Sequence, residues 1–288
     1  MLTPADTKET RMVGRFQDSV IIVTGASRGI GADIARVMAR EGAKVVASAR
    51  TLNEGDFHIP GSLAETVESI RAEGHEAVSC RCDLGNESDV EALVAFTMTR
   101  YGKIDALINN AGIATPGTIE SMKWRHLQLA WTINVAAPAL LSRLVLPHFR
   151  ERGSGAIINI SSGASRGPGP GPYARRAEGG TVYGLTKAAL ERMTQGMAAE
   201  LWGTGVSVNA LSPAKQIFVG GTVYVAEHDP AFAVSDLSGR RKDGTIMGDA
   251  CVAILSADPS VYTGRVVTDE AALTQLTGVT SFEHYPAF

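Results

Sequence analysis

The stretch Val20-Ile21-Ile22-Val23-Thr24-Gly25-Ala26-Ser27-Arg28-Gly29-Ile30-Gly31 decides the fold of this chain. Its first four residues form a short β-branched run, which is typical of a buried parallel strand. Residues 32–40 follow with apolar side chains at helical spacing. The glycines therefore lie in a strand-to-helix turn, where backbone N–H groups meet the positive end of a helix. This arrangement favours an anion such as a pyrophosphate.

The glycines of this turn have the spacing G-x-x-x-G-x-G rather than the more general G-x-G-x-x-G. Gly25 and Gly29 allow a tight turn and a close approach of the backbone to a ligand, and Gly31 allows the helix to pack closely on the strand. We expect the turn to bind a dinucleotide cofactor. The residues expected to contact it are Gly25, Ser27, Arg28, Gly29, Ile30 and Gly31.

The composition is that of an ordinary globular protein: 288 residues, 44% hydrophobic and 20% charged. A net charge of −3 gives no electrostatic case for binding nucleic acid or acidic membranes. No unbroken apolar run reaches the roughly 18 residues of a membrane span, and the start lacks a secretory pattern. The sparse, odd set of three cysteines suggests a reducing compartment, so we expect a cytoplasmic protein. The histidines form no close pair, and no metal site is expected.

Strand and helix patterns alternate along the chain, which predicts an α/β fold. Strands are expected over 19–24, 44–48, 76–81, 105–109, 155–161, 206–211 and within 263–267. Helices are expected over 29–41, 61–73, 86–101, 118–150 with a break near Thr132, and 183–202. The prediction is a Rossmann-type doubly wound parallel sheet of about seven strands, with helices on both faces. Residues 15–288 form its single domain, after a flexible tail over 1–14.

Arg50 follows the second expected strand, where a site that prefers NAD usually carries an acid for the ribose 2′-hydroxyl. Glu54 and Asp56 come only later, in the expected loop 53–61. Arg28 and Arg50 can instead bind a 2′-phosphate, because a guanidinium group matches it in a bidentate manner. The charge pattern therefore favours NADP(H) over NAD(H). The alternative is that both arginines are solvated surface residues.

Polar and small residues follow the third and fourth expected strands. Asp83 and Leu84 end the third strand, where a carboxylate faces the ligand crevice of such a sheet or caps the helix near Asn86. Both roles stay open. In Asn109-Asn110-Ala111-Gly112, small residues and amides let a cofactor lie against the backbone, although Asn109 can also satisfy only local backbone groups.

Tyr183 and Lys187 are four residues apart in Tyr183-Gly184-Leu185-Thr186-Lys187, so both lie on one helical face. A free tyrosine has a pKa of about 10, which leaves about 0.1% phenolate at pH 7. A nearby cation stabilises the phenolate and makes Tyr183 a workable general acid/base. The alternative is an amphipathic helix with a surface lysine. Ser161 and Ser162 end a strand and point to opposite faces, so at most one faces the crevice.

Three motifs together, Thr24–Gly31, Asn109–Gly112 and Tyr183-x-x-x-Lys187, resemble the classical short-chain dehydrogenases/reductases. The resemblance covers about residues 15–215. It implies hydride transfer between a nicotinamide cofactor and a small-molecule carbonyl or secondary alcohol. The residues it implies for cofactor binding also include Asn110, Ala111, Gly112, Tyr183 and Lys187.

The same resemblance assigns the catalytic roles. Tyr183 gives or takes the hydroxyl proton, and Ser162 polarises the carbonyl oxygen, which leaves Ser161 structural. Lys187 tunes Tyr183 and binds the nicotinamide ribose. Asn134 completes a proton relay; a buried asparagine bonded only to backbone is its alternative.

The chain departs from the family between Ser162 and Tyr183, which are farther apart than usual. The extra segment is rich in glycine and proline and contains Arg166, Arg175 and Arg176, which can contact an acidic substrate or belong to a solvated lid. Tyr173 lies nearer to Ser162, but alanine at position 177 leaves it without a lysine partner.

The chain also departs from the family after the sixth strand, where Pro213-Ala214 replaces the usual Pro-Gly. Pro213 and Ile217 are still expected to bind the cofactor, with a backbone contact of Ile217 to the carboxamide. Residues 214–245 are expected to cover the substrate. Tyr224, Phe232 and Leu237 would make this cover partly apolar.

Two expected helices, 132–150 and 183–202, are apolar on nearly all sides, and a helix of that kind must be covered all round. A homodimer or homotetramer through these helices is predicted. One alternative function is a non-catalytic nucleotide-binding regulator, since a fold does not imply a function. Another is an epimerase or dehydratase of the longer related families.

Overall fold

The computed structural model describes residues 14–115, 117–174, 177, 179–219 and 238–288. The expected tail lies outside these residues except for Gly14, and so does most of the expected substrate cover. The seven-stranded sheet has the order β3-β2-β1-β4-β5-β6-β7, and every adjacent pair is parallel. The strands are β1 Val20–Thr24, β2 Lys44–Ala49, β3 Ala77–Arg81, β4 Ala106–Asn109, β5 Gly155–Ile160, β6 Val206–Ser212 and β7 Val266–Thr268.

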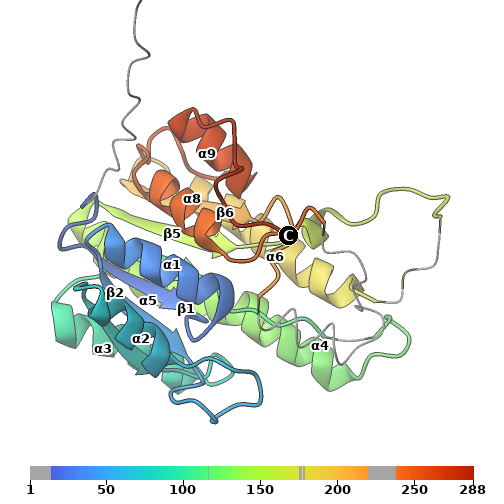
Figure 1. The fold of residues 1–288 in the computed structure, drawn as a ribbon, viewed down its shortest axis with the longest axis horizontal. Coiled ribbons are helices and arrows are strands. Elements are labelled where there is room, and N and C mark those ends of the chain that lie inside the picture. The colour runs from blue at the N-terminus through green and yellow to red at the C-terminus, as the bar shows by residue number, and fades with distance from the viewer. Residues whose placement is uncertain (1–13, 116, 175–176, 178, 220–237) are drawn as a thin grey trace, which may run out of the picture.

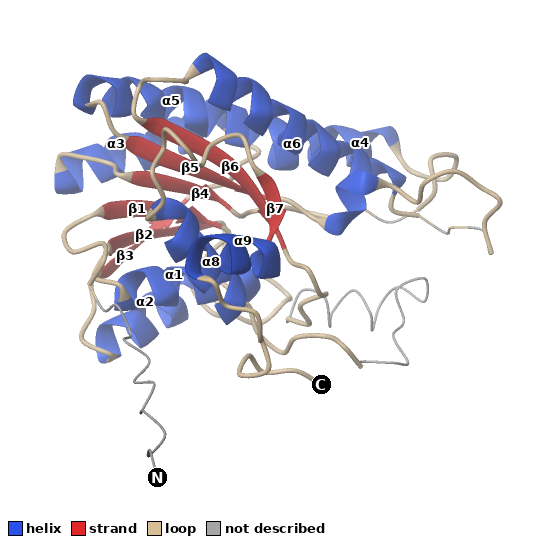
Figure 2. Cartoon of the chain, turned by 90° about the horizontal axis from the view of Figure 1, so that it is seen from above, coloured by secondary structure: helices blue, strands red, loops and turns tan. Residues whose placement is uncertain are grey.

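Helices cover both faces of the sheet (Figure 2). One face carries α1 Gly29–Arg40, α2 Leu63–Ala72, α8 Thr245–Leu255 and α9 Asp269–Thr277. The other carries α3 Glu87–Tyr101, α5 Ala137–Arg152 and α6 Thr181–Glu200, with α4 Trp124–Trp131 extending beyond the strand ends. The predicted doubly wound sheet, its strand number and the helices on both faces are thus confirmed.

The core divides into two apolar clusters, because successive strand residues point to opposite faces. Ile21 packs in the cluster that includes Met38 of α1. Its neighbour Ile22 packs in the cluster that includes Leu141 and Phe149 of α5. The β-branched run that begins the chain's glycine turn therefore anchors both layers.

The long helix predicted over 118–150 differs from the prediction at two places. It begins at Trp124, and the expected break is a π-helical segment, Thr132–Ala136, that continues into α5. Such a segment widens the helix without ending it and often occurs at functional sites. By length and composition the whole run Trp124–Arg152 would suffice to cross a membrane, but half of its most apolar window is buried inside the protein, as in a core helix.

Helices α8 and α9 were not predicted. The apolar residues of α8 occupy nearly all of its sides, so no helical period marks a single buried face. The helix packs between α1 and α9 (Figure 1). At its start, the Gly244 N–H donates a 2.8 Å hydrogen bond to Asp33 Oδ2 of α1.

The predicted partner subunit stays a prediction. Leu141, Val145 and Phe149 of α5 are fully buried within the chain itself. Trp124 at the start of α4 and Trp202 just after α6 are 67% and 65% exposed, so part of this helical layer presents large apolar side chains to its surroundings.

Replacing Gly248 should destabilise the fold. A Cβ there would lie 2.6 Å from the Cβ of Val37, so the two helices would have to separate. We expect Gly248→Ala to lower the free energy of unfolding by about 1–3 kcal/mol, measured by urea titration. At the matched position Gly196 in α6, a Cβ would meet only the flexible end of Arg192, at 3.1 Å. Gly196→Ala should stabilise by about 0.5–1 kcal/mol; equal effects of both variants would contradict this account of the α1–α8 contact.

Candidate active site

The carboxyl ends of β1 and β4 lie next to each other, at the point where the strand order reverses. The Asn110 Nδ2 group donates to the carbonyl oxygens of Thr24 at 2.9 Å and Gly25 at 3.3 Å. The backbone N–H groups of Asn110 and Ala111 each donate to Thr24 Oγ1 at 3.1 Å. The side chain of Asn110 therefore holds the glycine turn in place instead of extending away from the protein. In such sheets, ligands bind in the crevice at this reversal.

The glycine turn forms a cradle that side chains would fill. A Cβ at Gly31 would lie 2.3 Å from both Asn110 Nδ2 and the Gly25 carbonyl oxygen. Gly25 and Gly29 have φ angles of +66° and +57°, in the left-handed region that favours glycine. Arg28 is the N-cap residue of α1, but its side chain makes no capping hydrogen bond, and the first turn has no acid. The first N–H groups of α1 are thus suited to an anion.

Arg28 and Arg50 share one aromatic neighbour. Their guanidinium carbons lie 5.7 Å and 5.4 Å from the centroid of the Phe57 ring, within cation–π range. Arg28 also donates to the carbonyl oxygens of Pro60 and Gly61, at 2.8 Å and 2.6 Å. Burial lowers the pKa of Arg28, and the nearby Arg50 charge lowers it further, whereas Glu54 raises it. Both arginines therefore belong to one positively charged corner at the end of β2.

The acids of the 53–61 loop bind backbone N–H groups of the loop. Glu54 accepts from the N–H of Gly61 at 3.0 Å. Asp56 accepts from the N–H groups of Leu52 and Asn53, at 3.1 Å and 2.8 Å. These hydrogen bonds hold the loop together and direct both carboxylates to its own backbone.

Asp83 does not cap α3. The N-cap is Asn86, whose side chain accepts from the N–H of Ser88, while Asp83 Oδ1 accepts from the N–H of Gly85 at 2.9 Å. The capping alternative for Asp83 is therefore wrong. Leu84 is buried beside it. The cofactor contacts of Asp83 and Leu84 stay predictions.

Tyr183, Ser162 and Lys187 lie together where α6 passes the end of β5. The Ser162 hydroxyl lies near enough to the Tyr183 phenol to lower its pKa. Lys187 is only 3% exposed, and its Nζ donates to the carbonyl oxygen of Ile160 at 2.7 Å. The same Nζ lies 5.7 Å from the centroid of the Tyr183 ring. The helix begins at Thr181, two residues before Tyr183, so the tyrosine is held within regular helix.

The charge states of this group differ from the sequence expectation. Burial raises the pKa of Tyr183, and the nearby Ser162 side chain only partly opposes it. The expected lowering of this pKa by Lys187 is not among these effects. Burial also lowers the pKa of Lys187 to about 8, while the charge of Glu191 raises it. At neutral pH, Tyr183 is therefore a protonated phenol.

Asn134 lies in the π-helical segment and is fully buried. Its Oδ1 accepts from the Ile113 N–H at 2.8 Å, and its Nδ2 donates to the Ile113 carbonyl at 2.8 Å and to Thr186 Oγ1 at 3.0 Å. Both Nδ2 hydrogens are used, and Oδ1 keeps acceptor capacity. A Cβ at Gly112 would lie 3.2 Å from Lys187 Nζ and 3.4 Å from Asn134 Oδ1. The backbone at Gly112 therefore lies against both polar groups.

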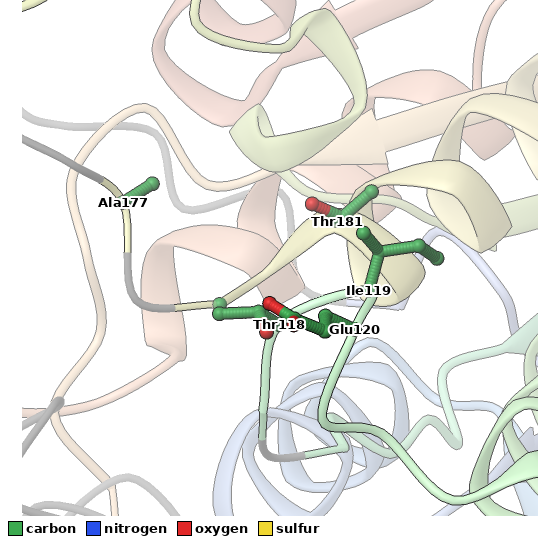
Figure 3. Close-up of a pocket in the computed structure, with 6 residues that line it drawn as sticks. Thr118, Ile119, Glu120, Ala177 and Thr181 are labelled. Atoms are coloured by element: carbon green, nitrogen blue, oxygen red, sulfur yellow. The ribbon is translucent and has the colours of Figure 1, made fainter.

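A pocket of about 210 Å³ opens between the loop that follows β4 and the start of α6 (Figure 3). Thr118, Glu120 and Thr181 supply polar groups to its lining, which also includes Ile119, Ala177 and Gly179. Thr181 opens the helix that carries Tyr183. None of the expected catalytic residues is among the residues that line this pocket.

Several other expected residues lie away from this group or outside the described residues. Tyr173 is 61% exposed and donates to the Gly169 carbonyl, at a distance of 2.7 Å. Ile217, which follows β6 and Pro213, is buried and pairs with Arg241. Arg175, Arg176, Tyr224, Phe232 and Leu237 lie outside the residues that the structure describes.

Sequence reasoning did not single out Glu191 or Thr186. Glu191 Oε1 accepts from Ser161 Oγ at 2.5 Å, and Thr186 binds Asn134. The signal for Glu191 was its position on α6, four residues after Lys187 and eight after Tyr183, which places all three on one helical face.

Comparison with known proteins shows the family of this chain. A family model described as short chain dehydrogenase matches residues 19–216. The chain belongs to the short-chain dehydrogenase family. This dehydrogenase is 36% identical over 213 residues to the ketoacyl reductase HetN of Nostoc sp., covering 74% of the chain and 69% of the relative. It is 32% identical over 276 residues to hydroxysteroid dehydrogenase-like protein 2 of Danio rerio, covering 94% of the chain but only 61% of that longer relative.

A solved structure supports the same assignment of the dehydrogenase. It is a single-residue variant of actinorhodin polyketide ketoreductase with NADPH, which matches with a TM-score of 0.75 and 26% identity, over 87% of the chain and 95% of that structure. The family consists of oxidoreductases that use a nicotinamide cofactor. The glycine cradle and the open N-terminus of α1 fit the pyrophosphate of such a cofactor.

Burial of the Lys187 charge should make the stability of this dehydrogenase depend on pH. The pKa falls from 10.5 to about 8 on folding, which corresponds to about 3 kcal/mol of destabilisation when the lysine is protonated. Between these two values the unfolded chain binds this proton more than the folded protein does, so this group makes the wild type more stable as the pH rises.

We therefore expect the Tm of Lys187→Met, relative to wild type, to be highest near pH 7 and to decline as the pH rises from 8 toward 10, measured by thermal unfolding. A Tm difference that stays constant over this range would show that the buried lysine carries no folding-linked proton.

Proposed function

We propose that this protein is an NADP(H)-preferring carbonyl reductase or secondary-alcohol dehydrogenase in which Tyr183 is the general acid/base. The observation that carries the proposal is the contact of Tyr183 with both Ser162 and Lys187. Gly112 lies against the same Lys187 Nζ, and it follows Asn110, which holds the glycine cradle. A cofactor seated in the cradle can therefore extend toward the tyrosine.

The bound nicotinamide supplies the hydride, and the chain supplies the proton and the orientation. Tyr183 donates its phenol proton to the carbonyl oxygen during reduction, and Ser162 donates a hydrogen bond to that oxygen as negative charge develops. The raised pKa of Tyr183 keeps this proton on the phenol at neutral pH. Asn134 Oδ1 and Lys187 Nζ both lie against the backbone of Gly112. Oδ1 can accept a further hydrogen bond, for example from a water molecule. Such a water could pass a proton to the proton-transfer group after Tyr183 has donated its own.

The preference for NADP(H) rests on the charges around the end of β2. Glu54 and Asp56 accept hydrogen bonds from backbone N–H groups of their own loop. Among the described residues neither acid forms an ion pair with Arg28 or Arg50, although the charge of Glu54 raises the pKa of Arg28. Arg50 remains exposed over Phe57, where its guanidinium can meet a 2′-phosphate. The NADPH complex of the related polyketide ketoreductase supports the same choice.

The substrate is a small carbonyl or secondary-alcohol compound. The relatives named ketoacyl reductase and polyketide ketoreductase favour a substrate with a keto group. Ketones and β-ketoacyl thioesters are therefore the first compounds to assay.

Replacing Tyr183 by phenylalanine should strongly reduce turnover and have a much smaller effect on cofactor binding, because phenylalanine keeps the aromatic ring. NADPH oxidation with a panel of ketones measures the rate, and we expect Tyr183→Phe to lower kcat by about 10²–10⁴-fold, because it removes the proton donor. Fluorescence titration with NADPH should give a Kd close to that of the wild type. Undiminished turnover would overturn the role of Tyr183. A wild type that binds NADPH tightly yet turns over no ketone would instead favour a nucleotide-binding regulator.

Replacing Arg50 should reduce the discrimination between the two cofactors. We expect Arg50→Gln to weaken NADPH binding by about tenfold, because one charged partner of the 2′-phosphate is lost, and to leave NADH binding nearly unchanged. Titration of both cofactors against wild type and variant measures the ratio of the two Kd values. Arg192→Gln, which removes an exposed arginine from α6, is the matched control. Equal losses for NADPH and NADH would contradict the assignment.

A further inference from the structure

Three consecutive residues at the end of β5 each contact a different turn of α6. The carbonyl oxygen of Ile160 accepts from Lys187, Ser161 donates to Glu191, and the Ser162 side chain lies near Tyr183 and lowers the pKa of its phenol. The three partners on α6 are spaced by four residues and form one row along the helix. Tyr183 and Lys187 belong to the proposed catalytic group, which leaves the third member of the row without an assigned role.

Glu191 is held in a defined position. Its Oε1 accepts a 2.5 Å hydrogen bond from Ser161 Oγ, and Ser161 is itself only 3% exposed. A charge-assisted hydrogen bond of this length is stronger than one between neutral groups. The carboxylate is thereby fixed against the strand end, one helical turn from Lys187, instead of moving freely in solvent.

Among the residues that the structure describes, the other groups that contact Lys187 are uncharged at neutral pH. The Ile160 carbonyl accepts its hydrogen bond from β5, the Tyr183 ring lies over it from α6, and Asn134 and the Gly112 backbone approach from the π-helical segment and the loop after β4. Ser162 adds a neutral hydroxyl through Tyr183. Neutral partners orient an ammonium group but do not balance its charge in a buried site. The charge of Glu191 raises the pKa of Lys187 against the effect of burial.

We infer that Glu191, anchored by Ser161, is a positioning residue whose fixed charge, one helical turn away, keeps Lys187 protonated beside Tyr183. The inference rests on the proposed reaction, in which a charged Lys187 supports the proton transfer of Tyr183. It gives a function to Ser161 as well: the hydroxyl of this serine orients the acid, while the hydroxyl of Ser162 contacts the tyrosine.

The test is the pH dependence of kcat/KM for NADPH-dependent ketone reduction by Glu191→Gln. Glutamine keeps the shape and can still accept from Ser161, but it removes the charge. In the wild type, activity should fall as the pH rises through about 8, where Lys187 loses its proton. Without Glu191, this descending limb of the pH–activity profile should move to a pH about one unit lower. The variant should then be about fivefold less active than the wild type at pH 8 and within about 1.2-fold at pH 6.

Two further variants make the result specific. Glu191→Asp keeps the charge and should leave the descending limb closer to that of the wild type than Glu191→Gln does. Glu200→Gln removes an exposed acid from the end of the same helix and should not move the limb. If Glu191→Gln does not fold, as judged by circular dichroism, Glu191→Ala provides the same loss of charge.

A uniform loss of activity at every pH would assign Glu191 a purely structural role and overturn the inference, and so would an unmoved limb. A wrong assignment of Tyr183 can be told apart from a wrong assignment of Glu191. If Tyr183 is not the proton donor, the Tyr183→Phe variant will show undiminished turnover in the same assay.

Discussion

The hydrogen bonds of the Asn110 side chain to the glycine turn are the constraint on which the site depends. They join the ends of β1 and β4 at the point where the sheet reverses its order. Gly31 must lack a side chain because that same amide occupies the space. The chain continues from Asn110 to Gly112, whose backbone lies against Lys187 and Asn134. One amide group thus connects the expected cofactor cradle to the expected proton-transfer group.

The second organising feature is the burial of polar groups where β5 meets α6. Lys187 lies in a nearly dry environment, and its proton affinity is reduced there. Tyr183 is buried as well, and its phenol retains its proton. Burying this ammonium group lowers the stability of the fold. Inside the protein, however, water screens hydrogen bonds and charges only weakly, so they act more strongly on the reacting groups. Sites of this kind commonly trade stability for activity.

Local patterns in the sequence predicted much of this architecture. The β-branched runs and the helical spacing between them identified the parallel sheet, because parallel strands are buried on both faces and are therefore continuously apolar. Tyr183 and Lys187 could be placed on one helical face from their spacing alone. The motif order then identified the family.

The features that were not predicted depend on contacts between distant segments. Helix α8 has no single apolar face, because both α1 and α9 cover it. The pKa of Tyr183 depends on its burial by elements that its own sequence does not reveal. The pairing of Ser161 with Glu191 joins residues 30 positions apart. The Asn134 segment was predicted as a helix break because periodicity does not distinguish a break from a π-helical turn.

The contact between α1 and α8 also bears on how this protein acquires its native structure. The hydrogen bond from Gly244 to Asp33 spans 211 residues of sequence and lies beside the glycine turn. Contacts of such separation form late, because the loop they close is long and a parallel sheet must assemble first. During synthesis, the first strand and helix of the nucleotide site leave the ribosome long before the helix that covers them. Until α8 emerges, the side of α1 that includes Val37 therefore lacks the helix that covers it in the folded protein.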